Sequence, residues 1–512
     1  MKAMTVLLSV CAAGAMTTAS AVPKLATPFA DGAVLQRGTK VPVWGTADPG
    51  ERVTVSFAGQ RVSARADVSG RWRVALEPMV ASKTGRELRV STEASADDLV
   101  VSDVLVGEVW FASGQSNMAF ALCVGQPQAC GDVHGRMVAQ MTRLPWVRYA
   151  AVRGQVSFEP RKTAELKWER FEPGFLTRPW AISAVAFYFA RELAIALDVP
   201  IGVICACSGA TCIETWTPKC GFAAHPELKD LDGWKYFAEK DWPKEWTTCP
   251  FNDWRQQPSL FWNGQVEAIV PYALRGLIWY QGCHNTTRPE NYSVKLHALY
   301  DGWSEKFENR RLKMYVVQLP AWGRSDAHQV LIQEAQARFA DEEPNAGLAV
   351  INDVGNVRDI HPDDKEPVGR RLALQALAKD YGFTDIECES PVLQDWKVVG
   401  NRFVLTFRHA KSLYVLNGDR SLSAPFEISG EDGVFRPAKI VNFLTRKVDG
   451  KSKPTGALAD NVLELVADGV EKPVNLRYLH CAPWIGSVFN EANLPLGTFH
   501  IGVCGIRPSR VK

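Results

Sequence analysis

Short runs of alternating apolar residues, separated by turn residues, open the chain. They lie at residues 41–45, 53–57, 62–66 and 72–76, with Asp48-Pro49-Gly50 and Ser69-Gly70 between them. Period-two runs bounded by glycine, proline and aspartate are typical of half-buried strands joined by tight turns. The pattern predicts an N-terminal β-domain over residues 22–102.

From residue 103 nearly continuous apolar runs alternate with helical periodicity. Continuous runs are typical of strands buried on both faces, and they fall at residues 104–112, 201–207, 274–280, 314–319 and 348–351. Apolar residues at helical spacing predict helices over residues 184–197, 330–339 and 365–379. Strands that alternate with helices indicate an α/β fold with a parallel sheet covered on both faces, here over residues 103–385.

Two stretches, 125–180 and 217–265, interrupt this alternation and are expected to be insertions. The tryptophans of the second either stack on a sugar or pack the insertion onto the body; they are Trp234, Trp242, Trp246, Trp254 and Trp262. Beyond residue 382 strand-like runs return at residues 402–407, 462–465 and 474–479. They predict a C-terminal β-domain over residues 386–512.

The net charge of the chain limits the classes of molecule that it is expected to bind. The 512 residues include 58 Lys and Arg and 56 Asp and Glu, for a net charge of +2, without a long run of either sign. This balance gives no electrostatic footprint for nucleic acid or for an anionic membrane. A neutral glycan or a small ester fits better, no membrane insertion is expected, and the oligomeric state stays open.

The first 21 residues have the pattern of a secretory signal peptide. Lys2 supplies a positive charge, residues 6–15 form a short apolar run, and Ala19-Ser20-Ala21 offers small residues for cleavage. Lipidation of Cys11 is disfavoured because Val10 is a poor residue before a lipidated cysteine. We therefore expect an exported protein, either periplasmic or secreted.

The chain has 12 cysteines, and cleavage would remove Cys11, which leaves an odd number that cannot all pair internally. Export permits disulfides, and the candidates are Cys481 with Cys504, or partners among Cys123, Cys130, Cys212, Cys220 and Cys249. Cys205 and Cys207 are expected to point to opposite faces of a strand and to remain buried free thiols.

The first candidate for chemistry is a serine that directly follows a buried strand. Residues 104–112 run into Ala112-Ser113-Gly114-Gln115-Ser116-Asn117-Met118. In a parallel α/β sheet the loops at the carboxyl ends of the strands converge on the reaction site. Ser116 therefore qualifies as a nucleophile, although Met118 departs from the Gly-x-Ser-x-Gly elbow.

The candidate base is His361, which follows the strand at residues 348–351. It also lies at a strand's carboxyl end, and Asp359 is two residues away. A carboxylate at that position could bond the imidazole and fix its tautomer. The same pattern is found where a surface histidine stands beside a helix start, so the motif alone leaves both interpretations open.

Three segments resemble the sialate O-acetylesterase family of SGNH-type carbohydrate esterases. They are Gly107 to Met118, which contains Gly-Gln-Ser-Asn-Met, Ile278-Trp279-Tyr280-Gln281-Gly282, and Ile360-His361-Pro362-Asp363-Asp364-Lys365. The opening β-domain, with Val34-Leu35-Gln36-Arg37, also resembles the leading domain of these proteins. The resemblance implies an SGNH-hydrolase-like sheet, flanked here by two β-domains, and the removal of acetyl groups from sugar hydroxyls.

The resemblance implies the following site residues. Ser116 matches the nucleophile and His361 the base. The N–H groups of Ser116 and Gly209 and the side-chain amide of Asn285 match the oxyanion donors. Gln115 matches the glutamine beside the nucleophile, and Gln115 and Gln281 are expected to contact substrate.

Three departures from the family pattern affect this assignment. Cys283-His284-Asn285 replaces the usual Glu-Ser-Asn, and Ala210 replaces a second glycine after Gly209. Arg358 stands where SGNH hydrolases commonly have an acid three residues before the histidine. Asp359 is our choice for the orienting acid and Asp353 the alternative, while a Ser–His pair without an acid also stays open.

The resemblance implies acyl transfer through an acetyl-serine intermediate without a cofactor. The chain has no His-Glu-x-x-His, no paired Cys-x-x-Cys and no phosphate-binding glycine loop, so no metal is expected at the site. The alternatives are a lipase or thioesterase of the same fold, and a non-catalytic carbohydrate-binding protein. The substrate class is open between acetylated sialic acid and an acetylated plant polysaccharide such as xyloglucan or xylan.

Overall fold

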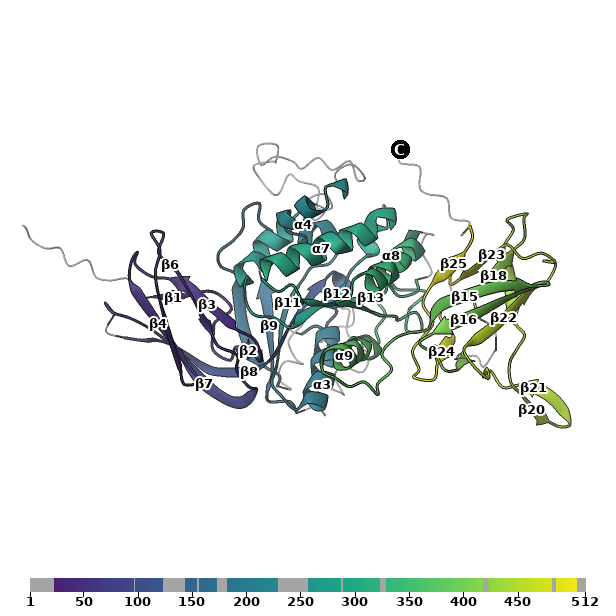
Figure 1. Ribbon diagram of the computed structural model, residues 1–512, viewed down its shortest axis with the longest axis horizontal. Helices are drawn as coiled ribbons and strands as arrows, with labels where there is room; N and C mark the ends of the chain where they lie inside the picture. The colour runs from purple at the N-terminus through teal and green to yellow at the C-terminus, as the bar shows by residue number, and fades with distance from the viewer. Residues whose placement is uncertain are drawn as a thin grey trace, which may run out of the picture.

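The computed structural model describes residues 23–503, apart from residues 96, 123–142, 154–155, 173–181, 229–256, 287–288, 323–327, 418–421, 423 and 481–484. Figure 1 shows three regions in a row, with an N-terminal β-region, a central α/β region and a C-terminal β-region. The predicted signal peptide lies outside the described residues.

The central sheet has the strand order β10-β9-β11-β8-β12-β13-β14. The strands are β8 (Leu99–Gly114), β9 (Val147–Arg153), β10 (Glu165–Arg170), β11 (Ile201–Cys207), β12 (Gly276–Tyr280), β13 (Lys313–Val317) and β14 (Ala346–Ala349). From β9 to β14 neighbouring strands are parallel, so their carboxyl ends meet at one edge of the sheet.

Helices cover both faces of this sheet, α4, α7 and α8 one face and α3 and α9 the other (Figure 1). Their bounds are α3 (Ala184–Leu197), α4 (Lys219–Ala224), α7 (Tyr292–Lys306), α8 (His328–Glu342) and α9 (Glu366–Asp380), and α1 (Ser116–Ala119) is a single turn. The 3₁₀ turns are Ile213–Trp216, Glu267–Ile269, Cys283–Asn285 and Pro289–Asn291, with a π-turn at Trp262–Val266. No helix in the described part of the chain is long and apolar enough to cross a membrane.

The N-terminal region shares the central sheet, because β8 begins in one region and ends in the other. β7 pairs with β8, β4 with β7, β5 with β4, and β2 with β8; their bounds are β2 (Val34–Gln36), β4 (Arg52–Phe57), β5 (Gln60–Arg65) and β7 (Ser82–Thr92). A separate three-stranded sheet contains β1 (Lys24–Leu25), β3 (Val41–Thr46) and β6 (Arg71–Leu76). The predicted boundary at residue 102 therefore falls inside β8, and one hydrophobic core extends across it.

Two predictions about the sheet are wrong. The stretch 125–180 is not wholly an insertion, because it contains β9 and β10 of the central sheet. The sheet is also mixed and not purely parallel, since β10 runs antiparallel to β9 and β7 antiparallel to β8.

The C-terminal region forms its own seven-stranded sheet, in the order β15-β16-β22-β19-β18-β23-β25, around a second hydrophobic core. The strands are β15 (Val392–Val399), β16 (Arg402–Arg408), β18 (Phe426–Ser429), β19 (Arg436–Ile440), β22 (Val462–Ala467), β23 (Asn475–Tyr478) and β25 (Phe499–Ile501). Two-stranded pairs add β17 (Leu413–Val415) with β24 (Val488–Asn490), and β20 (Thr445–Val448) with β21 (Lys451–Pro454).

Candidate active site

Ser116 stands at the carboxyl end of β8, on a turn that only glycine can make. Gly114 has a φ of +143°, and a Cβ at this position would lie 2.2 Å from the carbonyl oxygen of Tyr280 on β12. The next N–H, that of Gln115, donates to the same carbonyl at 3.1 Å. This close approach of β8 to β12 fixes the turn, and Ser116 begins α1 directly after it.

His361 lies within hydrogen-bond distance of this serine. Its Nε2 is 2.8 Å from the Ser116 Oγ, although 245 positions separate the two residues in sequence. Burial lowers the pKa of His361 below its usual value, Lys365 lowers it further, and Asp359 opposes the shift. A neutral imidazole facing a serine hydroxyl can accept its proton.

Asp359 and Asp353 have different surroundings. The Asp359 Oδ1 accepts the backbone N–H of His361 at 2.9 Å and lies 3.5 Å from its Nδ1. Asp353 instead forms a two-point ion pair with Arg371, at 2.6 and 2.7 Å. The structure thus brings Asp359 to the imidazole, whereas Asp353, the alternative acid, is engaged by Arg371.

Two further residues hold the histidine loop against the serine turn. The Asn117 Nδ2 donates to the carbonyl of Ile360 at 3.0 Å, and the Lys365 Nζ donates to the Asn117 Oδ1 at 2.6 Å. Lys365 is fully buried, with its ammonium 4.5 Å from the centre of the Phe120 ring. Both residues belong to the motifs that carry the family resemblance, yet sequence reasoning assigned them no role.

Gly209 is placed against the nucleophile by the turn that leaves β11. A Cβ added to Gly209 would lie 3.6 Å from the Cβ of Ser116, an ordinary contact. The turn is closed by the Ser208 N–H, which donates to the Gly114 carbonyl at 3.2 Å. Ala210 has a left-handed φ of 54°, which favours glycine.

The side chain of Asn285 is held by hydrogen bonds on both its oxygen and its nitrogen. Its Oδ1 accepts from the Ile213 N–H at 3.0 Å and from the Gln281 Nε2 at 2.7 Å. Its Nδ2 donates one hydrogen to the Glu214 Oε2 at 2.9 Å. An amide nitrogen carries two hydrogens, so a second N–H is left for another acceptor.

A buried ion pair lies behind this amide. Glu214 and Lys295 are 2.7 Å apart, and both side chains are only 3% exposed. Burial by itself would raise the pKa of Glu214, but the Lys295 ammonium and the Asn285 amide bring it below the usual value. Glu214 is therefore a carboxylate that orients Asn285.

The side chains of the two glutamines predicted to contact substrate form hydrogen bonds within the protein. Gln281 is fully buried, and its Nε2 donates to the Thr211 carbonyl and to Asn285 while its Oε1 accepts from the Tyr292 hydroxyl at 2.6 Å. Its prediction as a substrate contact is wrong, because both ends of the amide face the interior. The Gln115 Oε1 accepts the Gly282 N–H at 3.1 Å and so ties β8 to the turn after β12.

The tryptophan and cysteine predictions have mixed outcomes. Trp262 is buried and packs edge-on against Trp303, with ring centres 5.2 Å apart, so here packing is the correct alternative. The other four tryptophans of that stretch lie outside the described residues. Cys205 and Cys207 are free thiols as expected, although of the two only Cys205 is buried, and their sulfur atoms are 3.7 Å apart. Residues two apart on a strand share a face, so the predicted opposite orientation is wrong.

The disulfide candidates are only partly described. Cys212 and Cys220 carry reduced thiols in the structure, which contradicts the idea that either forms a disulfide within the predicted set. Cys123, Cys130, Cys249, Cys481 and Cys504 lie outside the described residues.

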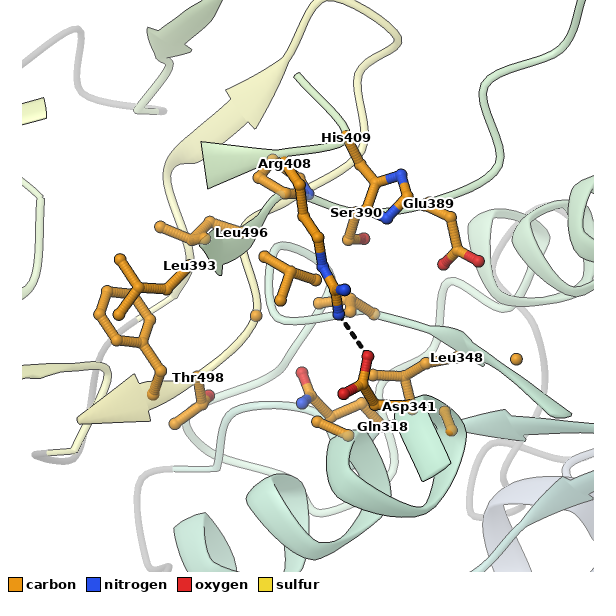
Figure 2. A pocket seen from close by; sticks show the side chains of 18 of the residues that line it. Gln318, Asp341, Leu348, Glu389, Ser390, Leu393, Arg408, His409, Leu496 and Thr498 are labelled. Carbon is orange, nitrogen blue, oxygen red and sulfur yellow. Dashed lines mark hydrogen bonds and ion pairs between the residues drawn. The ribbon is translucent and has the colours of Figure 1, made fainter. Parts of the chain in front are cut away.

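A cavity of about 540 Å³ lies between the central and C-terminal regions. Figure 2 shows Gln318, Asp341 and Leu348 on one side and Arg408, His409 and Leu496 on the other, with an ion pair between Arg408 and Asp341. None of the residues that surround Ser116 lines it. The cavity is lined in part by β14, the edge strand of the central sheet. It therefore lies at the junction of the two regions and is separate from the candidate active site.

Comparisons with known proteins show which proteins the chain resembles. A family model described as carbohydrate esterase, sialic acid-specific acetylesterase, matches residues 248–377. Asn285 and His361 lie inside this match, whereas Ser116 and Gly209 precede it.

Similarity to individual proteins extends over more of the chain than the family model does. The sialate O-acetylesterases of Homo sapiens and Mus musculus are 27% and 26% identical over 425 and 440 residues, which covers 76% of this chain and 76% and 78% of theirs. The crystal structure of a carbohydrate acetylesterase from Xanthomonas citri has a TM-score of 0.78 at 29% identity, and the match covers 94% of this chain and 100% of that one. The chain therefore resembles the sialate O-acetylesterases and the Xanthomonas citri carbohydrate acetylesterase over most of its length, and it is a carboxylic ester hydrolase.

Proposed function

We propose that the chain removes O-acetyl groups from a glycan through an acetyl-serine intermediate on Ser116. The observation that carries this proposal is the 2.8 Å approach of the His361 Nε2 to the Ser116 Oγ at the carboxyl end of β8. A serine hydroxyl is a weak nucleophile until a neighbouring base accepts its proton, and this pairing supplies one.

In the first half of the reaction the Ser116 Oγ attacks the acetyl carbonyl carbon while His361 takes the hydroxyl proton. The negative charge that develops on the carbonyl oxygen is stabilised by the N–H groups of Ser116 and Gly209 and by the second N–H of Asn285. The C–O bond to the sugar then breaks, and His361 returns the proton to the departing sugar oxygen. The acetyl group is now esterified to Ser116.

In the second half water replaces the sugar. His361 takes a proton from the water as its oxygen attacks the acetyl-serine carbonyl, and the same three donors stabilise the second tetrahedral intermediate. Collapse releases acetate, and the proton on His361 returns to the Ser116 oxygen. No step needs a group beyond these residues and water.

Hydrogen bonds from neighbouring side chains hold the base and the oxyanion donor in place before the reaction. Asn117 and Lys365 hold the histidine loop, while Glu214 and Gln281 hold the oxyanion donor, so few side chains must reorganise when charge develops. Preorganised donors of this kind supply much of the rate enhancement in acyl transfer.

The substrate test is acetate release from a matched panel of esters. The purified chain should release acetate from acetylated sialic acid or from acetylated xyloglucan or xylan, and should act poorly on long-chain esters and thioesters. Faster turnover of long-chain esters would support the lipase or thioesterase alternative. Glycan binding without acetate release would support a non-catalytic binding protein.

We also propose that the chain is exported, on the basis of the signal-peptide pattern in its first 21 residues. Fusion of those residues to a reporter that is active only after export tests this directly. Reporter activity that is unchanged when the apolar run at residues 6–15 is interrupted by charged residues would contradict it.

A further inference from the structure

A group of three side chains at the junction of the central and C-terminal regions takes no part in the proposed reaction. Glu334 lies on α8, His500 on β25, and His480 two residues after β23. α8 faces the sheet that contains β23 and β25 (Figure 1). The group therefore joins elements from two regions of the chain.

Both imidazoles present a nitrogen to the same carboxylate oxygen. The His480 Nε2 is 3.1 Å and the His500 Nδ1 is 2.6 Å from the Glu334 Oε1. The three potential ligand atoms all lie within 4.8 Å of one another. Imidazole nitrogen and carboxylate oxygen are the ligands that zinc and similar ions accept in proteins.

This group differs from the histidine–carboxylate contact at His225, because at Glu334 two imidazoles contact the same carboxylate oxygen. His225 also has two carboxylate partners, Glu227 at 3.2 Å and Asp301 at 2.7 Å. These contact opposite nitrogens of the ring, so one ion cannot reach both carboxylates and the imidazole together. At Glu334 one nitrogen of each imidazole and one carboxylate oxygen lie within 4.8 Å of one another.

The charge of Glu334 and the burial of the group also suit a cation. Burial by itself would raise the pKa of Glu334, but hydrogen bonds from the two imidazoles bring it to about 2, so it is a carboxylate at neutral pH. Burial lowers the pKa of His480 and thereby favours its neutral form. The His480 side chain is fully buried and that of Glu334 is 17% exposed, whereas His500, at 30% exposed, gives solvent a path to the group.

We propose that Glu334, His480 and His500 bind one divalent transition-metal ion, such as Zn²⁺, which fastens the C-terminal sheet to α8. Zinc bonds of about 2.0–2.2 Å in a tetrahedron place ligand atoms roughly 3.3 Å apart, so the distances from the Glu334 oxygen to the two imidazole nitrogens need to change by less than about 1 Å. Water supplies the fourth ligand from the side of His500. The ion adds to two nearby contacts between the regions, Thr498 to Gln333 at 3.1 Å and Arg408 to Asp341.

The test uses the full chain, stripped with a chelator and then titrated with ZnCl₂ and, separately, with CoCl₂. We expect binding of about one ion per chain at this group, a rise in the midpoint of thermal unfolding, and visible Co²⁺ absorption typical of mixed nitrogen and oxygen ligands. Binding should weaken as the pH falls, because a protonated imidazole cannot bind a metal.

Three variants decide whether this group is the site. His500→Gln and Glu334→Gln should remove the metal-dependent rise in the unfolding midpoint, whereas His225→Gln, the matched control, should retain it. Acetate release similar to that of the parent in the metal-free His500→Gln protein would show that this variant is folded. The free cysteines could also bind zinc, so equal zinc binding by the parent and by His500→Gln would overturn the proposal, as would no saturable binding by the parent.

Discussion

Asn285 is proposed to donate to the oxyanion and also to stabilise the fold, and one substitution should affect both kcat and the free energy of unfolding. In Asn285→Ala we expect kcat to fall by about 10²- to 10³-fold with little change in KM, because the second N–H of the amide is used mainly in the transition state. The loss of its bonds to Ile213 and Glu214 should also lower the free energy of unfolding by about 1–3 kcal/mol. Steady-state kinetics and denaturant unfolding measure the two effects independently.

His284→Ala is the companion variant, because His284 neighbours Asn285 and could serve as an alternative oxyanion donor. We expect it to retain most of the parent's kcat. Normal kcat in Asn285→Ala together with a large loss in His284→Ala would show that the donor has moved by one residue.

Substitutions of Asp359 and Lys365, two neighbours of His361, should shift the pH dependence of kcat/KM in opposite directions. His361 must be neutral to act as a base, so kcat/KM should fall as the pH drops through its pKa, which lies below 6.5. Asp359 raises the pKa of His361, so Asp359→Asn should move the acid limb to lower pH. Lys365 lowers it, so Lys365→Met should move the limb to higher pH. Shifts in the same direction in both variants would contradict these assignments.

The sequence indicated the two residues proposed to react more readily than the side chains that support them. Ser116 and His361 stand after predicted strands, where chemistry is expected in an α/β sheet. Glu214, Lys295 and Lys365 are charged, and nothing in a single sequence indicates that such side chains are buried and paired. Gln281 was misassigned for the same reason, since its motif does not reveal which way its amide points.

Among the elements, the strongly apolar ones were predicted best. α3 spans Ala184–Leu197 as predicted, because apolar residues fill its buried face and the Ser183 side chain caps its first turn at 3.1 Å. α7 was missed because Ser293, Lys295 and Ser304 are among its buried residues. A helix whose inner face carries polar residues lacks the periodicity on which prediction depends.

At the contact between β8 and β12 we predict that Gly114→Ala is strongly destabilising. A methyl group there would overlap the Tyr280 carbonyl, and the φ of +143° is unfavourable for alanine. The strained conformation alone costs about 1–3 kcal/mol, and the overlap adds to it. Gly209→Ala is the control for folding, since its Cβ would make only an ordinary contact. Equal unfolding midpoints for these two variants would contradict the role given to Gly114.

At the scale of the whole molecule, β8 connects the N-terminal region to the reaction site. Its 16 residues pair with β7 at one end and present Ser116 at the other. The hydrophobic pattern changes near residue 103 and so predicted a boundary at residue 102, although the strand itself is continuous. The C-terminal region was recognised from its strand-like runs, but its contacts with α8 join residues far apart in sequence and could not be predicted from pattern.

The most direct test of the account combines acetate release with detection of the acetylated enzyme. The parent should release acetate from an acetylated glycan, and rapid quenching should trap an acetyl group on Ser116. Ser116→Ala and His361→Ala should each lower kcat by at least about 10³-fold while remaining folded, because both belong to one proton-transfer unit. Turnover within a few-fold of the parent in either variant, or an acetyl group trapped on another residue, would contradict the proposed mechanism.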